Sequence, residues 1–309
     1  MRAGYSIVFC LIAFLSAGCG RVVQHQEASS ADDVTHQTST STRRITFDLP
    51  ISRQFMDPKV FQATEGLGVF GFTGRPVAGV VNHHVLAVDL IARFFKTLKA
   101  SRPDITTFII LSPDHFSRGR GVSTSRLPYV TPAGTVDITA LNVTSTGVWD
   151  GTPARAFEQE HGVGALAPFV AREFPQAKIM PIFLRADVRP EDASALGKAL
   201  AASSDDKTFV VVSSDMSHFL REKDARAHDA DTIAWLESGS WDKLESATDK
   251  NTDSAVGLAI LNVYLKQKAP LTRGDAEGGY QFFLLSHKLS TDYVADPNNT
   301  TSYIVGFWE

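Results

Sequence analysis

Thr107-Phe108-Ile109-Ile110-Leu111 leads directly into Ser112-Pro113-Asp114-His115, and this stretch decides the fold. Two more apolar runs, Val77–Val81 and Phe209–Val212, end in the same manner, in Asn82-His83-His84 and in Ser213–His218. Strands that are apolar throughout are buried on both faces, which is typical of a parallel sheet covered by helices. Because ligands of such sheets bind outside the carboxyl ends of the strands, the histidines that follow these runs predict a site.

The segments between and after these runs predict the other layers of the fold. Leu86, Leu90, Phe94 and Leu98 recur every four residues, as on the buried face of an amphipathic helix. Further helical patterns lie within 163–174, 196–200 and 233–264, further strands cover 179–184, 280–285 and 303–308, and 117–134 is a loop-rich insertion. We predict an α/β fold: a single three-layer α/β/α domain with a mostly parallel central sheet and antiparallel C-terminal edge strands.

Length and charge narrow the classes of function. The chain has 309 residues, 43% of them hydrophobic, which is enough for the core of one large α/β domain. Its net charge of -4 comes from interspersed acidic and basic residues that form no basic face. Nucleic acid is therefore not expected as a partner.

The first 43 residues predict export. Residues 1–18 form a signal peptide, whose apolar part Ile7–Ala17 is too short to span a bilayer. Leu15–Cys19 resembles a bacterial lipoprotein signal in which Cys19 receives the lipid, and the alternative is an ordinary secretory signal. The polar residues 19–43 predict a flexible tether before the folded domain, 44–309. We expect an exported lipoprotein of the outer membrane or the periplasmic face, attached to the membrane only through its lipid.

The strand ends carry donors for a metal ion. A non-haem iron(II) centre often uses two imidazoles and one carboxylate and leaves positions open for substrate and dioxygen. His83 and His115 would supply the imidazoles, whereas spacing alone does not choose the carboxylate. The candidates are Asp114, Glu160, Asp215 and Asp253. Alternatively, the histidines hydrogen-bond loop backbone, and Asp253 caps the helix that follows it.

Five segments of the chain together resemble a known family. In chain order they are His83, Ser112–Phe116, Thr131–Gly134, Glu160–Gly164 and the most specific one, Ser213-Ser214-Asp215-Met216-Ser217-His218. This ordered set resembles the Memo-like proteins, called AmmeMemoRadiSam system protein B in prokaryotes, from about Val77 to the C-terminus. The family is similar in fold to the class III extradiol dioxygenases, whose iron is held by two histidines and an acidic residue.

The resemblance implies roles for particular residues. His83 and His115 correspond to metal ligands of the family, and Asp253 stands where the family often has a cysteine ligand. Iron is then the first expectation for the divalent metal, with zinc or copper as alternatives. His218 and His161 are the expected catalytic acid/base residues, although His161 could instead open a helix as a structural residue. The remaining polar residues expected to surround the ligands are His84, Asp215 and Asp114.

Two functions of different class stay open at this point. The first is a dioxygenase-like oxidoreductase, in which iron holds a vicinal diol and dioxygen while His218 or His161 moves a proton. The second is a binding module for a small molecule, a peptide or a metal ion without turnover. It is favoured by Gly164, which replaces a glutamate of the family, and by the altered run His83–Leu86. A serine hydrolase based on Ser214 is disfavoured because the chain has no Gly-x-Ser-x-Gly turn.

Overall fold

Four parallel strands occupy the centre of the sheet. The computed structural model describes residues 57–139, 157, 159–269 and 279–309. The central strands are β1 (Ala78–Val81), β2 (Thr107–Pro113), β6 (Lys178–Leu184) and β7 (Thr208–Ser213), paired in the order β6-β2-β7-β1. They are buried along almost their whole length. The prediction of a parallel sheet from uniformly apolar runs is confirmed.

Antiparallel strands flank this centre on both sides. β9 (Ser302–Trp308) pairs with β1, and β8 (Phe282–Leu289) pairs with β9, so the predicted antiparallel C-terminal edge is confirmed. At the other edge β3 (Val122–Thr124) pairs antiparallel with β6. A small hairpin of β4 (Tyr129–Thr131) and β5 (Gly134–Val136) follows. The segment 117–134, expected to be a loop, thus contributes strands, which were missed because three residues are too few to show an alternating pattern.

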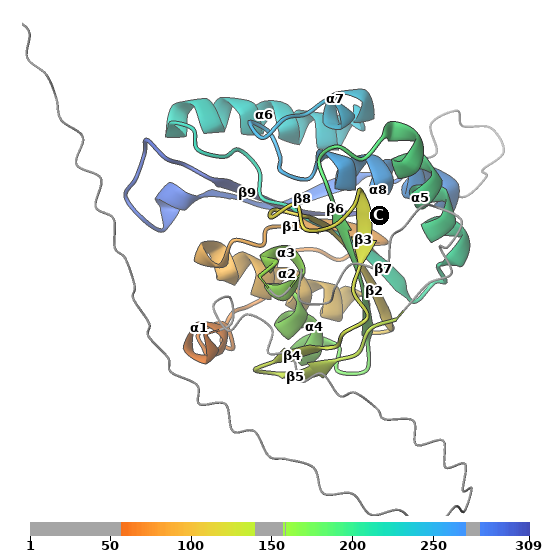
Figure 1. The fold of residues 1–309 in the computed structure, drawn as a ribbon. Coiled ribbons are helices and arrows are strands. Elements are labelled where there is room, and N and C mark those ends of the chain that lie inside the picture. Colours follow the sequence, from red (N-terminus) through yellow and green to blue (C-terminus); the bar gives the residue numbers. More distant parts are fainter. Residues whose placement is uncertain (1–56, 140–156, 158, 270–278) are drawn as a thin grey trace, which may run out of the picture. The chain divides into compact units, whose positions relative to one another are not determined.

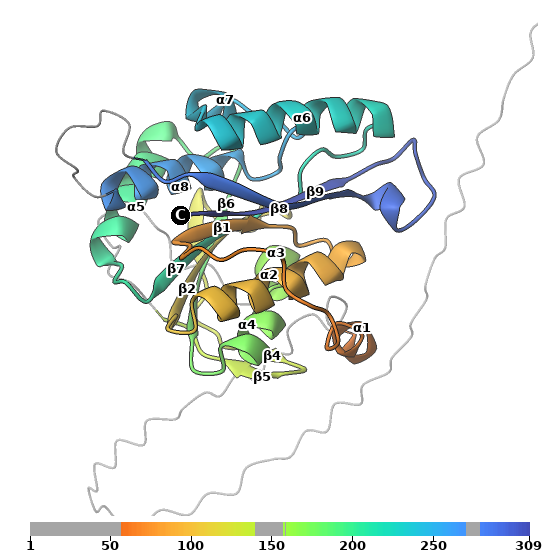
Figure 2. The same cartoon turned by 180° about the vertical axis from the view of Figure 1, so that it is seen from behind.

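Helices cover both faces of the sheet, which confirms the three layers (Figures 1 and 2). One face carries α2 (Val88–Ser101), α3 (His161–Gly164) and α4 (Ala167–Glu173), with α1 (Pro58–Gln62) beside them. The other face carries α5 (Pro190–Ser203), α6 (Glu222–Ser238), α7 (Trp241–Glu245) and α8 (Ala255–Lys268). Two 3-10 turns, η2 (Val85–Ala87) and η5 (Ser290–Asp292), complete the described elements.

The alternation of side chains along the strands divides the core in two. Phe108 and Ile110 of β2 pack with the helices on the α2 side, whereas Ile109 and Leu111 pack with those on the α8 side. On α2 the predicted apolar positions Leu90, Phe94 and Leu98 are fully or almost fully buried. The sheet is therefore fixed from both sides, and the loops at the carboxyl ends of its strands are held in place.

A buried arginine joins the loops at the opposite ends of the strands. Arg102 donates to the backbone oxygens of Pro76 and Asp206 and pairs with the Asp104 carboxylate, Nε to Oδ1, at 3.0 Å.

Replacing Arg102 by methionine should lower the free energy of unfolding by about 3 kcal/mol, because buried acceptors lose their donor. Urea titration measures this change. Arg226→Met, which removes an exposed pair with Glu222, is the control and should cost less than about 1 kcal/mol; equal effects would contradict the prediction.

The predictions for the N-terminal segment lie outside the described residues. This holds for the signal peptide 1–18, for the tether 19–43 with Cys19, and for the first residues of the predicted domain 44–309. Among the residues that the structure describes, no helix has the length and apolar character needed to cross a membrane. The N-terminal interpretations therefore stay predictions.

Candidate metal centre

His83 lies two residues after the end of β1, and its ring is held through Nδ1. The ring is almost completely buried, and its Nδ1 lies 3.0 Å from Ser213 Oγ. Ser213 donates its one hydroxyl proton to the backbone oxygen of Gly162 at 2.6 Å. The hydroxyl therefore accepts a hydrogen bond from His83 Nδ1–H. In the neutral ring the lone pair then lies on Nε2, which faces the other histidines of the site.

Glu160 holds His115, the histidine that follows β2. Glu160 Oε1 lies 2.7 Å from His115 Nδ1, and its Oε2 accepts from the His115 backbone N–H at 2.9 Å. An ionised carboxylate only accepts, so Nδ1 carries a proton. Glu160 also caps α3 by accepting from the Gly162 N–H at 3.1 Å. A carboxylate bound to the far nitrogen of an imidazole is the arrangement that orients metal-binding histidines in proteins.

Asp253 directs one carboxylate oxygen at three imidazoles. Asp253 Oδ2 lies 3.3 Å from His83 Nε2, 3.4 Å from His115 Nε2 and 3.8 Å from His218 Nε2. Its other oxygen, Oδ1, accepts from Ser214 Oγ at 3.0 Å. The residue that caps α8 is Ser254, so Asp253 faces the histidines and is not the cap. The structure thus brings together the two histidines and the carboxylate that the family resemblance implied.

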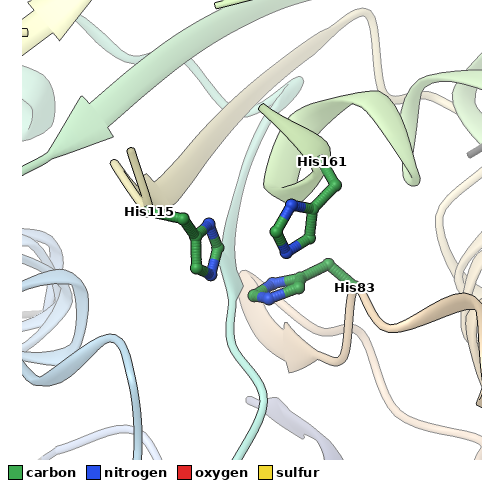
Figure 3. Close-up of side chains that lie close together, drawn as sticks. All are labelled: His83, His115 and His161. Atoms are coloured by element: carbon green, nitrogen blue, oxygen red, sulfur yellow. The ribbon is translucent and has the colours of Figure 1, made fainter. Parts of the chain in front are cut away.

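His161 adds a third imidazole to this group. It is the first residue of α3, and its ring centroid lies 4.1 Å from that of His115 and 4.9 Å from that of His83. Figure 3 shows the three rings turned toward a common space. One ligand nitrogen from each of the three lies within 4.8 Å of the others, so the cluster could hold a metal ion. His161, predicted as an acid/base residue, therefore lies among the candidate ligands.

The charges of the site depend on one another. Burial alone would lower the pKa of His115, but hydrogen bonds to Asp253 and Glu160 outweigh it and raise this pKa to about 10. Burial, together with the charges of His83 and His115, lowers the pKa of His161 to about 3. Burial opposes ionisation of Asp253, yet the charge of His83 and the hydrogen bonds from both histidines keep its pKa well below the usual range. Without a metal ion, protons on imidazoles thus balance the buried carboxylate.

The other predicted residues lie around this group. Asp215 Oδ1 accepts from the backbone N–H groups of His83 at 3.0 Å and of His84 at 3.3 Å, and so fixes the end of β1. His84 is exposed at the rim, where its Nδ1 lies 2.7 Å from Tyr303 Oη. His218 is half-buried, and its Nε2 faces Asp253.

Asp114 directs its carboxylate into the loop after β2. It accepts from the backbone N–H groups of Arg118 at 3.0 Å and Gly119 at 2.6 Å. Its contribution in this structure is to hold the loop that carries His115.

Two supporting residues were not assigned these roles from the sequence. The sequence offers Glu160 as a possible third ligand and places Ser213 in the most specific motif of the family resemblance, but it indicates neither contact with a histidine. Glu160 carries a visible signal, because acidic residues often precede a helix. Its contact with His115, which lies 45 positions earlier, depends on how α3 packs against the end of β2 and has no local signal.

A cavity reaches the Asp253 side chain, although none of the clustered histidines lines it. It has a volume of about 450 Å³ and lies between the starts of α5 and α8, and its lining includes Pro113, Arg185 and Asp253. This volume is within the range of small-molecule sites. Asp253 therefore faces the histidines and also lines a space large enough for a ligand.

Comparison with known proteins identifies the family of the chain. Residues 82–307 match the family model described as Memo-like protein. A MEMO1 family protein of Methanosarcina acetivorans is 23% identical over 261 residues, which cover 82% of this chain and 93% of the relative. A MEMO1 family protein of Nitrosopumilus maritimus is 27% identical over 241 residues, which cover 75% of this chain and 82% of the relative. One of Archaeoglobus fulgidus is 29% identical over 207 residues, which cover 65% of this chain and 75% of the relative. Since the family model spans well over half of its length and includes every histidine of the cluster, the chain belongs to the Memo-like protein family.

Proposed function

We propose that this protein binds one divalent metal ion, with iron as the first candidate, and acts as an oxidoreductase similar to extradiol dioxygenases. The proposed ligands are His83, His115 and Asp253, and His161 is an adjacent donor. The position of Asp253 Oδ2, 3.3 and 3.4 Å from the two Nε2 atoms, carries the proposal. Atoms bound to one ion at about 2.1 Å lie roughly 3 Å apart, so Asp253 Oδ2 is close to the separation from each Nε2 atom that a shared cation requires.

The donor set fits the proposed metal. The Nδ1 atoms of both histidines are engaged by Ser213 and Glu160, which leaves the Nε2 atoms for coordination. Two imidazoles and one carboxylate suit iron(II), and they also suit zinc or copper. Bound iron would supply redox chemistry and open positions for a diol substrate.

The surrounding residues would bind substrate and move protons. We assign proton transfer to His218, whose Nε2 lies 3.8 Å from Asp253 Oδ2, with His161 as the alternative. The cavity of about 450 Å³ offers space for a small substrate next to Asp253. Asp215 would keep His83 and His84 in position through their backbone N–H groups.

The proposal includes a location outside the cytoplasm. The signal-like residues 1–18, Cys19 and the polar tether 19–43 support an exported lipoprotein of the outer membrane or the periplasmic face. Radiolabelled palmitate should enter the expressed full chain and should not enter Cys19→Ser. Equal labelling of both would reject lipidation at Cys19.

The central experiment measures metal content and oxygen uptake. The mature protein is stripped, loaded with iron(II) without oxygen, and analysed by elemental analysis. It is then tested for oxygen uptake with a panel of phenols and catechols. One iron per chain and an uptake that is lost in His218→Ala support the proposal. A protein that retains no stoichiometric iron, zinc or copper overturns it.

A second candidate is a binding module on the same cavity. It is favoured by Gly164, which is buried on α3 where the family has a glutamate, so that a potential acid/base group is missing. One metal per chain without oxygen uptake on any substrate of the panel would support this candidate over the oxidoreductase.

Glu160→Gln tests whether the partner of His115 supports the metal. The amide keeps the size of the side chain and loses its charge, so zinc affinity should fall roughly 10- to 100-fold with little change in fold. Titration calorimetry measures the affinity, and circular dichroism checks the fold. Glu222→Gln, at the start of α6, is the matched control and should bind like the wild type. An unchanged affinity in Glu160→Gln would show that the contact is not part of a metal centre.

A further inference from the structure

Two phenylalanines next to the histidine cluster are exposed to solvent. Phe116 is 44% exposed and Phe219 is 78% exposed, whereas every other phenylalanine of the described residues is buried or half-buried. Two exposed rings beside one candidate site mark a place where an apolar part of a ligand would be buried. We call these two residues the aromatic pair.

Both members of the aromatic pair belong to the candidate site by sequence and by contact. Phe116 directly follows His115, and its ring centroid lies 6.4 Å from that of His161. Phe219 directly follows His218, and the centroids of these two rings lie 5.8 Å apart. The imidazoles that they contact lie close to the candidate ligands. The pair thus places two apolar rings beside the histidine cluster, on loops that follow β2 and β7.

The backbone is strained at one of these phenylalanines and directly after the other. Among non-glycine residues of the described part, positive φ angles occur only at Ser117, with φ 50°, and at Phe219, with φ 53°. A bulky residue in this left-handed region of backbone angles costs conformational energy that glycine would avoid. One strained residue is Phe219 itself, and the other directly follows Phe116. One exposed ring therefore belongs to a strained residue, and the other belongs to the residue directly before one.

We propose that the aromatic pair makes the metal centre select ligands whose metal-binding group is attached to a flat aromatic ring, an inference that rests on the proposed metal site. Offset or edge-on contact with each phenyl ring would stabilise such a ligand, and an aliphatic ligand with the same metal-binding group would gain less. A small molecule is the expected occupant, because two side chains cover far less area than a stable protein interface.

The test compares two ligands that differ in the ring. Benzohydroxamate and acetohydroxamate carry the same chelating group, and calorimetry gives the affinity of the zinc-loaded mature protein for each. The wild type should prefer benzohydroxamate. This preference should fall roughly three- to tenfold in Phe116→Ala and again in Phe219→Ala. Leu284→Ala, which removes an exposed apolar side chain on β8, is the control and should keep the preference.

A second variant separates ligand selection from a structural role. Phe219→Gly places glycine at the positive φ angle, so the thermal midpoint should stay or rise while the preference for benzohydroxamate falls. A lower midpoint with an unchanged preference would show that Phe219 serves the fold, and would overturn the proposal.

The remaining outcomes are distinguishable. If acetohydroxamate binds normally and the preference survives in both alanine variants, the aromatic pair has no role in selection and the metal site stands. If zinc does not bind to the wild type, or neither hydroxamate binds to the zinc-loaded protein, the accessible metal site fails and the inference falls with it.

Discussion

The double variant His83→Ala, His115→Ala should lose metal binding altogether, with an affinity for zinc more than about a thousandfold below that of the wild type. Even the loss of a residue that only supports a ligand costs 10- to 100-fold, so the loss of two ligands costs far more. The double variant should also be less stable than the wild type, because the Glu160 and Asp253 carboxylates lose the imidazoles that balance their charge, and circular dichroism checks that it is folded. Elemental analysis after dialysis and titration calorimetry measure the effect. His228→Ala, on α6 outside the site, is the matched control.

Single variants then identify the third ligand. Asp253 Oδ2 lies 3.3 and 3.4 Å from the two Nε2 atoms, whereas the ring of His161 stacks on that of His115. Asp253→Ala should therefore weaken zinc binding more than His161→Ala does. The reverse order would replace the two-histidine, one-carboxylate site by a site of three histidines. Wild-type affinity in the double variant would reject the whole site.

The fold was predictable where the pattern of side chains is long. The apolar run 107–111 predicted the buried strand β2. The four-residue spacing from Leu86 to Leu98 predicted α2, although Leu86 itself lies in η2. The short β3 was not predictable, because its place beside β6 depends on an edge left open by the rest of the sheet. A long pattern of apolar residues shows which side chains are buried. The formation of a three-residue edge strand depends instead on the neighbouring strand with which it pairs.

The candidate site was predictable from strand ends but not in its supporting contacts. His83 and His115 follow β1 and β2, which lie on either side of β7 in a parallel arrangement, so their convergence follows from the topology. Asp253 precedes α8 and was assigned by the family resemblance, since no strand end marks it. The pairing of Glu160 with His115 depends on the packing of α3 against β2. Contacts of this kind arise from tertiary structure and leave no periodic trace in the sequence.

Zinc affinity should rise about tenfold for each pH unit between pH 6 and 8. The pKa of His115 is about 10, so its ring is protonated throughout this range, and a metal ion must displace a proton from Nε2. Lower proton concentration therefore favours the metal, and the affinity increases with pH up to the pKa. The pKa of His83 is also raised, since the charges of Asp215 and Asp253 outweigh burial, so a proton displaced from this ring as well would make the rise steeper than tenfold. Calorimetry in buffers of different ionisation enthalpy counts the protons released.

Glu160→Gln separates this proton competition from the strength of the metal site itself. The carboxylate of Glu160 is one of the groups that raise the pKa of His115, and a neutral amide in its place lets this pKa fall. The variant should bind zinc more weakly at pH 8 and yet show a smaller increase in affinity between pH 6 and 8. Equal slopes in the wild type and the variant would mean that the displaced proton does not come from His115. A wild-type affinity independent of pH would place the metal away from His115 Nε2 and contradict the proposed ligand set.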